Sequence, residues 1–401
     1  KITRELTFLT LEKLKEVLSL ELFDELNNKY AAQGGLAILS DSNVEYDNPG
    51  KLLVLRMLRH EIKKIHRRNP GTIDQLYFKL GSIFDGVEVV AEDRMQEKTM
   101  EFFQQLYPDA RIKFGSKSSG VQLGCIANVY DQTGKMFKYY VKTHTDGLQT
   151  SKSSAAEKFN PIELFVYKIL EATGIGCRVY FFGRNEFDTY IATLDAAHEG
   201  EFVTYEKIKE TMPKKRSECI ALIQQNQDLQ VVAYEISKLD LLARVLKLQD
   251  LQTNPGNFGF LSAPGKQKQV KVLDFRVLKG ETFEGWTTTE GSFNALMNGN
   301  GEYNYVDPFM LAVLRSDGPI DKTATLIKVF AEFSLFENMV TEARQNFISD
   351  LTEFTKNEEV IEAATSSIDI YSKIFIDNFK LLKRLFDQRV ASTRSDEVLL
   401  Q

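Results

Sequence analysis

The spacing of apolar residues predicts helices near both ends of the chain. Apolar side chains recur three or four positions apart in these regions, as they do on one face of an α-helix. The predicted N-terminal helices lie at about 8–22, 52–66 and 93–106, with a loop and a short apolar run at 81–90. Near the C-terminus the pattern covers 321–390, and we interpret its phenylalanine-rich stripe at 326–340 as core rather than as a membrane or partner face.

The middle of the chain has a different pattern. Short runs dense in apolar and aromatic residues predict strands at 111–115, 121–129 and 136–143. The segment Asp131-Gln-Thr-Gly134 is a hairpin turn signal, so these strands should form an antiparallel meander. A helix should follow from Asn160, which can cap it, and Pro161, which is tolerated at the first helical position, to about Ala172. Two further strands are predicted at 178–182 and 189–194.

Helical patterns return after residue 203 and are strongest at 229–248. A loop at 250–259 and a strand at 270–277 should follow, and the Gly-, Thr- and Asn-rich residues 278–305 are predicted to be irregular. Together these elements predict the α+β fold class. The chain should divide into four regions. Residues 1–108 and 319–401 should be helical, and residues 109–195 and 196–318 should each combine strands and helices.

Composition and charge exclude several classes of protein. The 401 residues are 43% hydrophobic and 26% charged, which is ordinary for a globular chain. Fifty Lys and Arg against 56 Asp and Glu give a net charge of −6, whereas nucleic-acid-binding proteins are usually basic, so no nucleic-acid partner is expected. No stretch approaches the roughly 18 consecutive apolar residues of a membrane span, so no transmembrane segment is expected either.

Cysteine and histidine are too scarce and scattered for a disulfide framework or a histidine-rich metal site. The three cysteines are Cys125, Cys177 and Cys219, and such usage is typical of a reducing compartment. Any catalysis should therefore depend on carboxylates, amides and lysine.

Glycine and serine are concentrated between the first two predicted strands, in Gly115-Ser-Lys-Ser-Ser-Gly120. Glycines allow backbone amides to approach phosphates closely, and small serines such as Ser116, Ser118 and Ser119 do not block them. A plain hairpin turn explains the segment about as well.

Two charged residues of the next elements are candidates for a functional role. Lys142 ends an apolar run in the third strand, and Glu163 lies in the first turn of the helix that follows. Each has a simpler explanation, as a solvated strand residue and as an acid that complements the helix dipole. Lys138 shares a strand face with Lys142, and Glu157 replaces Glu163 if the helix begins earlier.

The strongest candidates for metal chemistry follow the helix at 229–248. The loop Asp250-Leu-Gln-Thr-Asn254-Pro-Gly-Asn257 combines one acid with two amides, those of Asn254 and Asn257. A turn without chemistry is the alternative interpretation. Asp274 then stands alone in an apolar strand, where it should bind a metal or a cation because burying a bare carboxylate is costly.

The order of these elements resembles the protein-kinase-like fold over roughly residues 110–310. Lys142 and Glu163 are 21 residues apart and Asp250 and Asp274 are 24 apart, close to the spacing in that family. The loop departs from the family pattern by two extra residues before Asn257, and Arg276 replaces the glycine that usually follows Asp-Phe. The chain is most similar to remote, atypical members, including effectors of intracellular bacterial pathogens.

The resemblance implies a bilobal kinase-like region with additional helical N-terminal and C-terminal regions. It implies ATP and Mg²⁺ as cofactors, and phosphate transfer to a hydroxyl of an unknown protein substrate. Lys142, positioned by Glu163, would hold the phosphates, and Asp250 would orient the acceptor. Asp274 and Asn257 would bind Mg²⁺, with Asn254 as the second match for the family's metal-binding amide. The other nucleotide-binding positions would be Gly115, Ser116, Ser118, Ser119, Gly120 and Leu194. Such a protein would be intracellular, in the cytoplasm or delivered into a host cell.

A basic helix lies outside the region of resemblance. Its cations include Arg59, Lys63, Lys64, Arg67 and Arg68, a local positive field in an acidic chain. A solvated helix face is one interpretation. The other is a polyanion site for an inositol phosphate, a phosphoinositide or an acidic partner that regulates the kinase. The shorter run Lys214-Lys-Arg216 is a smaller candidate.

Three alternative functions remain open from the sequence. The same fold could phosphorylate a lipid or small molecule, or transfer a nucleotide. The rebuilt Asp250 loop also suits a pseudokinase scaffold, and the helical regions suit a membrane or adaptor platform.

Overall fold

The structure is a computed structural model of the chain. It describes residues 15, 18–29, 35–39, 49–68, 71, 74–116, 124–144, 160–185, 188–251, 253–277, 283–299 and 307–399. These residues fall into two compact units. The first draws on Lys1–Asn160, Tyr180–Thr193 and Asp350–Asn357, and the second on Pro161–Val179, Leu194–Ser349 and Glu358–Gln401. Helices and antiparallel sheets occur together, which confirms the predicted α+β class.

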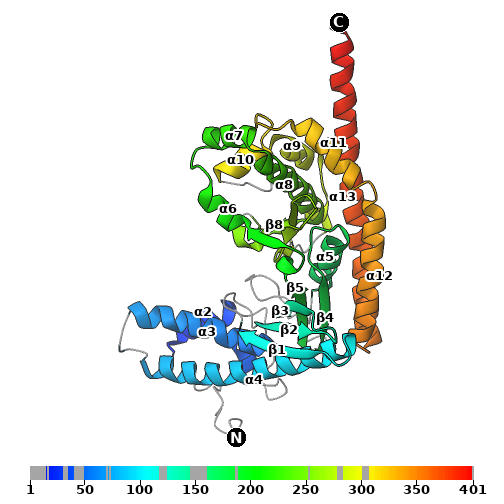
Figure 1. The fold of residues 1–401 in the computed structure, drawn as a ribbon. Helices are drawn as coiled ribbons and strands as arrows, with labels where there is room; N and C mark the ends of the chain where they lie inside the picture. Colours follow the sequence, from blue (N-terminus) through cyan, green and yellow to red (C-terminus); the bar gives the residue numbers. More distant parts are fainter. Residues whose placement is uncertain are drawn as a thin grey trace. The chain divides into compact units, whose positions relative to one another are not determined.

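A five-stranded sheet forms the centre of the first unit, with the strand order β1-β2-β3-β5-β4 (Figure 1). The strands are β1 (Arg111–Ser116), β2 (Gly124–Tyr130), β3 (Met136–His144), β4 (Val179–Asn185) and β5 (Asp188–Leu194). The predicted meander is confirmed, because β1 pairs antiparallel with β2 and β2 with β3. Its turn is held by the Asp131 carboxylate, which accepts hydrogen bonds from the Thr133 and Lys135 amides, both at 2.9 Å, while Gly134 takes a φ of +81°.

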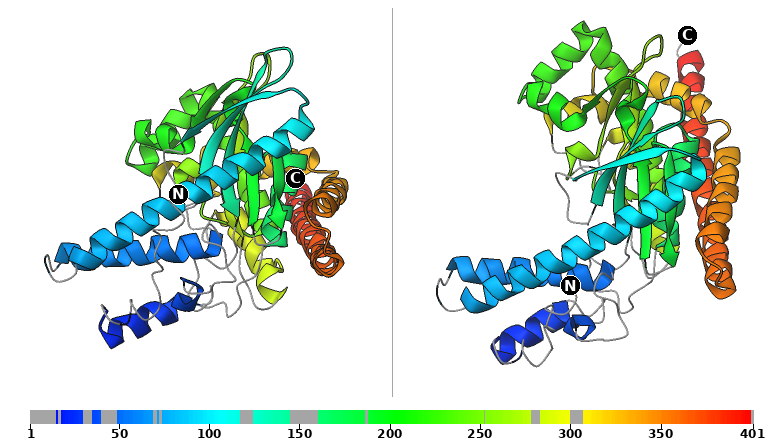
Figure 2. Two further views of the ribbon diagram at one scale, coloured as in Figure 1. Left: turned by 90° about the horizontal axis from the view of Figure 1, so that it is seen from below. Right: turned by 60° about the horizontal axis from the view of Figure 1, so that its bottom comes forward.

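The helices of the first unit precede the sheet in sequence. They are α2 (Leu20–Lys29), the 3₁₀ helix η3 (Gly35–Leu39), α3 (Pro49–Arg68) and α4 (Asp74–Leu106). The C-terminal part of α4 packs on the sheet, where Phe103 lies against Tyr139 and Phe102 stacks on Phe182 (Figures 1 and 2). The loop predicted at 81–90 is wrong, because α4 continues through it. Gly81 lies inside a helix, at a cost of about 1 kcal/mol that the rest of a long helix can offset.

The second unit is built around helix α8 (Gln227–Leu246), which is buried from Glu235 onward. Before it come α5 (Pro161–Ala172), the 3₁₀ helix η4 (Ala196–His198), β6 (Glu201–Thr204), α6 (Tyr205–Thr211) and α7 (Arg216–Gln225). After it come β7 (Leu248–Gln249), the 3₁₀ helix η5 (Pro255–Asn257), β8 (Phe258–Ser262), β9 (Gln269–Val272) and β10 (Arg276–Val277). The strands form two small antiparallel sheets, β6-β8-β9 and β10-β7.

The C-terminal helices complete the second unit. They are the 3₁₀ helix η6 (Phe283–Trp286), α9 (Glu290–Asn298), α10 (Pro308–Leu314), α11 (Lys322–Glu332), α12 (Phe336–Phe354) and α13 (Glu358–Leu399). In α13 the buried Asn378 donates hydrogen bonds to the Val245 and Trp286 carbonyls, at 3.0 and 2.8 Å, and so ties α13 to α8. No helix in the described ranges combines the length and hydropathy that crossing a membrane requires.

The prediction that residues 278–305 are irregular is wrong for Glu290–Asn298, which form helix α9. Thr289 and Ser292 form a capping box at its start, and Gly299 ends it with a φ of +65°. Thr289 and Gly299, two of the residues that made this stretch look irregular, are therefore helix caps. The four predicted regions remain a prediction, and the two compact units do not follow their boundaries. For example, α5, placed within 109–195 by the sequence, belongs to the second unit, and Asp350–Asn357, placed within 319–401, belongs to the first.

Three charged side chains are buried together in the second unit. Asp240 and Arg244, one turn apart on α8, form an ion pair with both side chains fully buried, and the Arg244 Nε lies 3.2 Å from each carboxylate oxygen. Lys322 of α11 donates to the Leu314 carbonyl at 3.2 Å. Burial lowers the pKa of Lys322 to about 8, a shift that Asp240 opposes and Arg244 reinforces.

Replacing Lys322 by methionine is expected to remove a pH-dependent part of the stability. Because the pKa is lower in the folded state, the unfolded chain binds more protons between pH 8 and about 10.4, so this group makes stability rise with pH in that window. Below pH 8, burial of the protonated Lys322 amine lowers the free energy of unfolding by about 3 kcal/mol. Urea unfolding at pH 7, 8, 9 and 10 should show Lys322→Met more stable than wild type at pH 7, with the difference shrinking toward pH 10.

The difference between the two proteins is the informative quantity. Burial raises the pKa of Cys125 to about 12 and of Cys177 to about 11. These two thiols therefore make stability fall as pH rises, and they do so equally in wild type and in the variant. Lys328→Met, at an exposed position of the same helix, is the matched control. A difference between Lys322→Met and wild type that stays constant with pH would contradict the burial of this amine.

Candidate active site

The backbone turns sharply where α8 ends. Lys247 caps the helix in the left-handed conformation, with a φ of 55°, and Asp250 also has a positive φ, of 69°, on the other side of β7. Positive φ values are uncommon for residues other than glycine, and in folded proteins they cluster at functional sites. The strand β7 between them pairs with β10, which places Gln249 opposite Arg276.

The Asp250 carboxylate is held by its own loop. Its Oδ1 accepts hydrogen bonds from the Thr253 hydroxyl at 2.7 Å and from the Asn254 amide at 3.0 Å. Its Oδ2 lies 3.7 Å from Nε of Arg276, the residue that follows Asp274-Phe275. The side-chain amides of Asn254 and Asn257 both donate to Asp250, so the choice of Asn257 over Asn254 as metal ligand stays a prediction.

Asn257 connects the Asp250 loop to the segment that carries Asp274. Its side-chain amide donates to the Asp250 carbonyl at 3.1 Å. Its own backbone carbonyl accepts from the amides of Leu273 and Asp274, at 2.7 and 3.2 Å. Two segments that are separate in sequence are therefore held together at the two candidate metal ligands.

Asp274 lies between β9 and β10, with its carboxylate oriented by two donors. Its Oδ1 accepts from the Tyr167 hydroxyl of α5 at 3.1 Å and from the Phe275 amide at 3.0 Å. The rings of Tyr167 and Phe275 pack with centroids 4.4 Å apart, which fixes the tyrosine beside the acid. Tyr167 was missed by the sequence analysis. Its one signal there was the spacing of four residues from Glu163, which puts both on one face of the helix.

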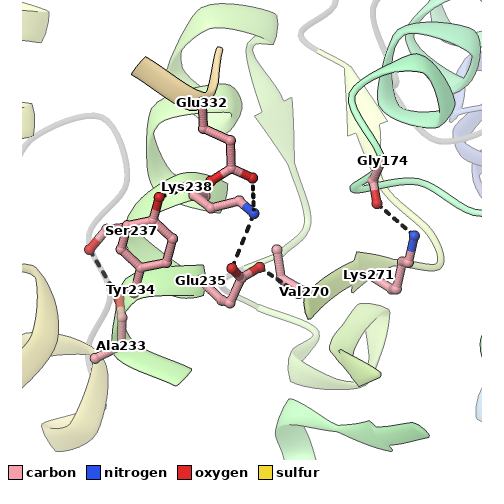
Figure 3. A network of polar contacts seen from close by, with 9 residues as sticks. All are labelled: Gly174, Ala233, Tyr234, Glu235, Ser237, Lys238, Val270, Lys271 and Glu332. Atoms are coloured by element: carbon pink, nitrogen blue, oxygen red, sulfur yellow. Dashed lines mark hydrogen bonds and ion pairs between the residues drawn. The ribbon is translucent and has the colours of Figure 1, made fainter. Parts of the chain in front are cut away.

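A buried polar network supports β9 from the side of α8 (Figure 3). Glu235 accepts from the Val270 amide at 2.8 Å and from Lys238 at 3.1 Å, and Lys238 also binds Glu332 of α11 at 2.6 Å. Burial raises the pKa of the Glu235 carboxyl, and Lys238 acts against that shift. Lys271, which follows Val270, donates to the Gly174 carbonyl at 2.6 Å. The strand that leads to Asp274 is thus fixed to α8 and to the end of α5.

The donor set is suited to a hard divalent cation. A carboxylate and an amide carbonyl are oxygen ligands, and Mg²⁺ commonly takes only one or two protein ligands and completes its shell with water and phosphate. In the described part of the chain no three His, Cys, Asp or Glu side chains cluster as a complete metal site. Asn257 and Asp274 could therefore contribute to a Mg²⁺ site that a phosphate ligand completes.

The remaining candidates lie on other elements. Lys142 lies on β3 opposite Gly124, and Lys138, four positions earlier on the same strand, lies over the Tyr140 ring at 4.8 Å. Gly115 and Ser116 end β1, Leu194 ends β5, and Glu163 lies in the first turn of α5. Ser118, Ser119, Gly120 and Glu157 lie outside the described residues. Lys142 and Glu163 belong to different compact units, so their pairing stays a prediction.

Comparison with known proteins adds little to this geometry. No protein-family model matches the chain, and no curated protein does. Among solved structures the chain is similar to the Helicobacter pylori proinflammatory kinase CtkA, with a TM-score of 0.40 and 14% sequence identity. The match covers 69% of this chain and 97% of the other. A likeness this distant does not establish a shared fold or activity.

Proposed function

We propose that this chain is an atypical ATP- and magnesium-dependent kinase that transfers phosphate to a hydroxyl, most simply that of a protein. The observation that carries the proposal is the connection through Asn257, which brings the Asp250 loop and Asp274 together within one compact unit. The element order also supports it, since a helix with a glutamate lies between the third and fourth strands of an antiparallel sheet.

Each residue has one task in this proposal. Asp274, oriented by Tyr167, and Asn257 would hold Mg²⁺, which would neutralise charge on the phosphate oxygens. Lys142, positioned by Glu163, would hold the phosphates, and the β1–β2 turn with Leu194 would contact the nucleotide. Asp250 would accept or orient the acceptor proton. Positioning and electrostatics supply most of the rate enhancement in phosphoryl transfer, so no nucleophilic side chain is required.

One observation favours a second candidate, a pseudokinase. The Asp250 carboxylate already accepts hydrogen bonds from Thr253 and Asn254 and lies near Arg276. A carboxylate engaged in this way is a poorer base for a substrate hydroxyl. A pseudokinase would retain nucleotide binding at the Asp274 end of the site and lose transfer.

A nucleotide assay with mass spectrometry distinguishes these proposals. Purified chain with Mg²⁺ and γ-labelled ATP is expected to label itself or an added protein, and the mass of the adduct separates a phosphoryl group from an AMP group. A lipid or small-molecule acceptor would leave proteins unlabelled while ATP is consumed. Binding without any turnover would identify the pseudokinase. If ATP and Mg²⁺ produce no thermal shift, with or without an inositol polyphosphate, the enzyme proposal is wrong.

A further inference from the structure

The C-terminal end of α3 carries a dense group of exposed cations in the first unit. Lys63, Lys64, Arg67 and Arg68 are all exposed. They lie within about one and a half helical turns, or about 7.5 Å along the axis. Lys63 lies one turn from Arg67, and Lys64 one turn from Arg68, so the four side chains form two adjacent rows. We call these four residues the basic cluster.

Little negative charge offsets the basic cluster. Glu61 pairs with Lys64 at 3.2 Å. Among the residues that the structure describes, no carboxylate lies within ion-pair distance of Lys63, Arg67 or Arg68. Cations at a helix C-terminus complement the helix dipole, but one or two in the last turn are enough for that. The concentration of charge in an acidic chain therefore points to an external anion.

An exposed aromatic ring stands beside the basic cluster. Helices α3 and α4 run side by side (Figures 1 and 2), and near the turn that joins them His66 stacks on Tyr77 with centroids 4.4 Å apart. Phe78 packs edge-on against both, at 6.3 and 5.4 Å, yet 67% of its surface remains exposed. The stacked pair thus holds a large apolar side chain in water next to the cations.

We propose that this end of the α3–α4 hairpin docks on a membrane surface that contains anionic lipids. The cations would bind the phosphate-bearing headgroups, and Phe78 would insert its ring into the interface. A soluble polyanion or an acidic protein surface would use the cations but would leave the exposed Phe78 ring without a role. The proposal is independent of the kinase proposal, because it uses none of the residues of the candidate active site.

The test is co-sedimentation of the full chain with vesicles of phosphatidylcholine alone or with 30% phosphatidylserine, at several salt concentrations. Binding is expected only to the anionic vesicles and should weaken as salt rises. Each cation near such a surface is worth about a fivefold increase in partitioning, so K63Q/K64Q/R67Q/R68Q should lose binding by several hundredfold. F78S should lose a smaller but measurable part of the binding.

A variant with the same change in charge elsewhere is the control. K266Q/K268Q/K328Q/K373Q removes four cations from partly or fully exposed positions of the second unit and should bind like wild type. Circular dichroism melts should show that each variant remains folded. Equal losses in the control and the cluster variant would overturn the proposal. It would also be overturned if F78S had no effect on vesicle binding, which would indicate a site for a soluble polyanion such as inositol hexakisphosphate.

Discussion

Replacing Asp274 by asparagine is expected to reduce phosphoryl transfer about a thousandfold while the protein stays folded. Asparagine keeps the oxygen that accepts from Tyr167 and the Phe275 amide, so the local geometry should persist. The charge, however, is lost at the point where the kinase proposal needs it, next to the metal and the phosphate oxygens. The measurement is transfer from γ-labelled ATP at several Mg²⁺ concentrations, with a thermal melt of each protein.

The hydrogen bond from Tyr167 provides a graded companion to this experiment. Tyr167→Phe retains the ring that packs on Phe275 and removes only the hydroxyl that orients Asp274. Loss of such an outer contact typically costs ten- to a hundredfold in metal affinity or activity. Added Mg²⁺ should restore part of this loss, whereas it should not restore activity to Asp274→Asn.

The control for both variants is Asp228→Asn, an exposed acid in the first turn of α8. It should have wild-type activity. Full activity in Asp274→Asn would show that Asp274 does not bind the metal, and the kinase proposal would fail with it. A loss in Tyr167→Phe that no concentration of Mg²⁺ relieves would instead assign the tyrosine a purely structural role.

The elements that the sequence predicted well are those whose signals are local. The turn at Asp131–Gly134 contains its own acceptor and its own positive-φ glycine, and Asn160-Pro161 marks the start of α5 within two residues. Such signals need no knowledge of distant contacts. These local signals predicted the positions of three strands and one helix, and the resulting order of elements indicated the fold class.

The missed elements depend on partners far away in sequence. Strand β8 pairs with both β6 and β9, and Gly259 in its middle allows a close approach, because a Cβ there would lie 2.4 Å from the Val203 carbonyl oxygen. A glycine after Asn257 looks like part of a loop until that neighbouring strand is known. The contact of Tyr167 with Asp274 spans 107 residues, and no spacing rule predicts it.

The candidate site was predictable as a set of residues but not as an arrangement. Asp274 could be named because a bare carboxylate is costly to bury in an apolar strand, and Asp250 and Asn257 because they match a motif of the kinase-like fold that the sequence resembles. The sequence could not show that Thr253, Asn254 and Arg276 would engage Asp250, since that depends on a rebuilt loop with a positive φ. That engagement is the observation that favours the pseudokinase proposal.

Replacing Asp240 by leucine is expected to destabilise the second unit by about 3–5 kcal/mol. Asp240 is the acid of the fully buried pair on α8, and its loss would leave Arg244 and the nearby Lys322 as buried cations without that counter-charge. Urea unfolding would measure the change. Asp317→Leu breaks a solvent-exposed pair with Arg216 and should leave the unfolding midpoint near that of wild type.

The double variant Asp240→Leu with Arg244→Met decides whether the charge or the packing is responsible. If the uncompensated cation causes the loss, removing it should restore most of the stability, because a buried ion pair can often be replaced by apolar residues of similar volume. If the two losses simply add, the side chains stabilise the core through their shape, and the pair has no special electrostatic role. Since α8 leads through β7 to the Asp250 loop, the kinase proposal predicts that a stably folded double variant shows the same thermal shift with ATP and Mg²⁺ as wild type.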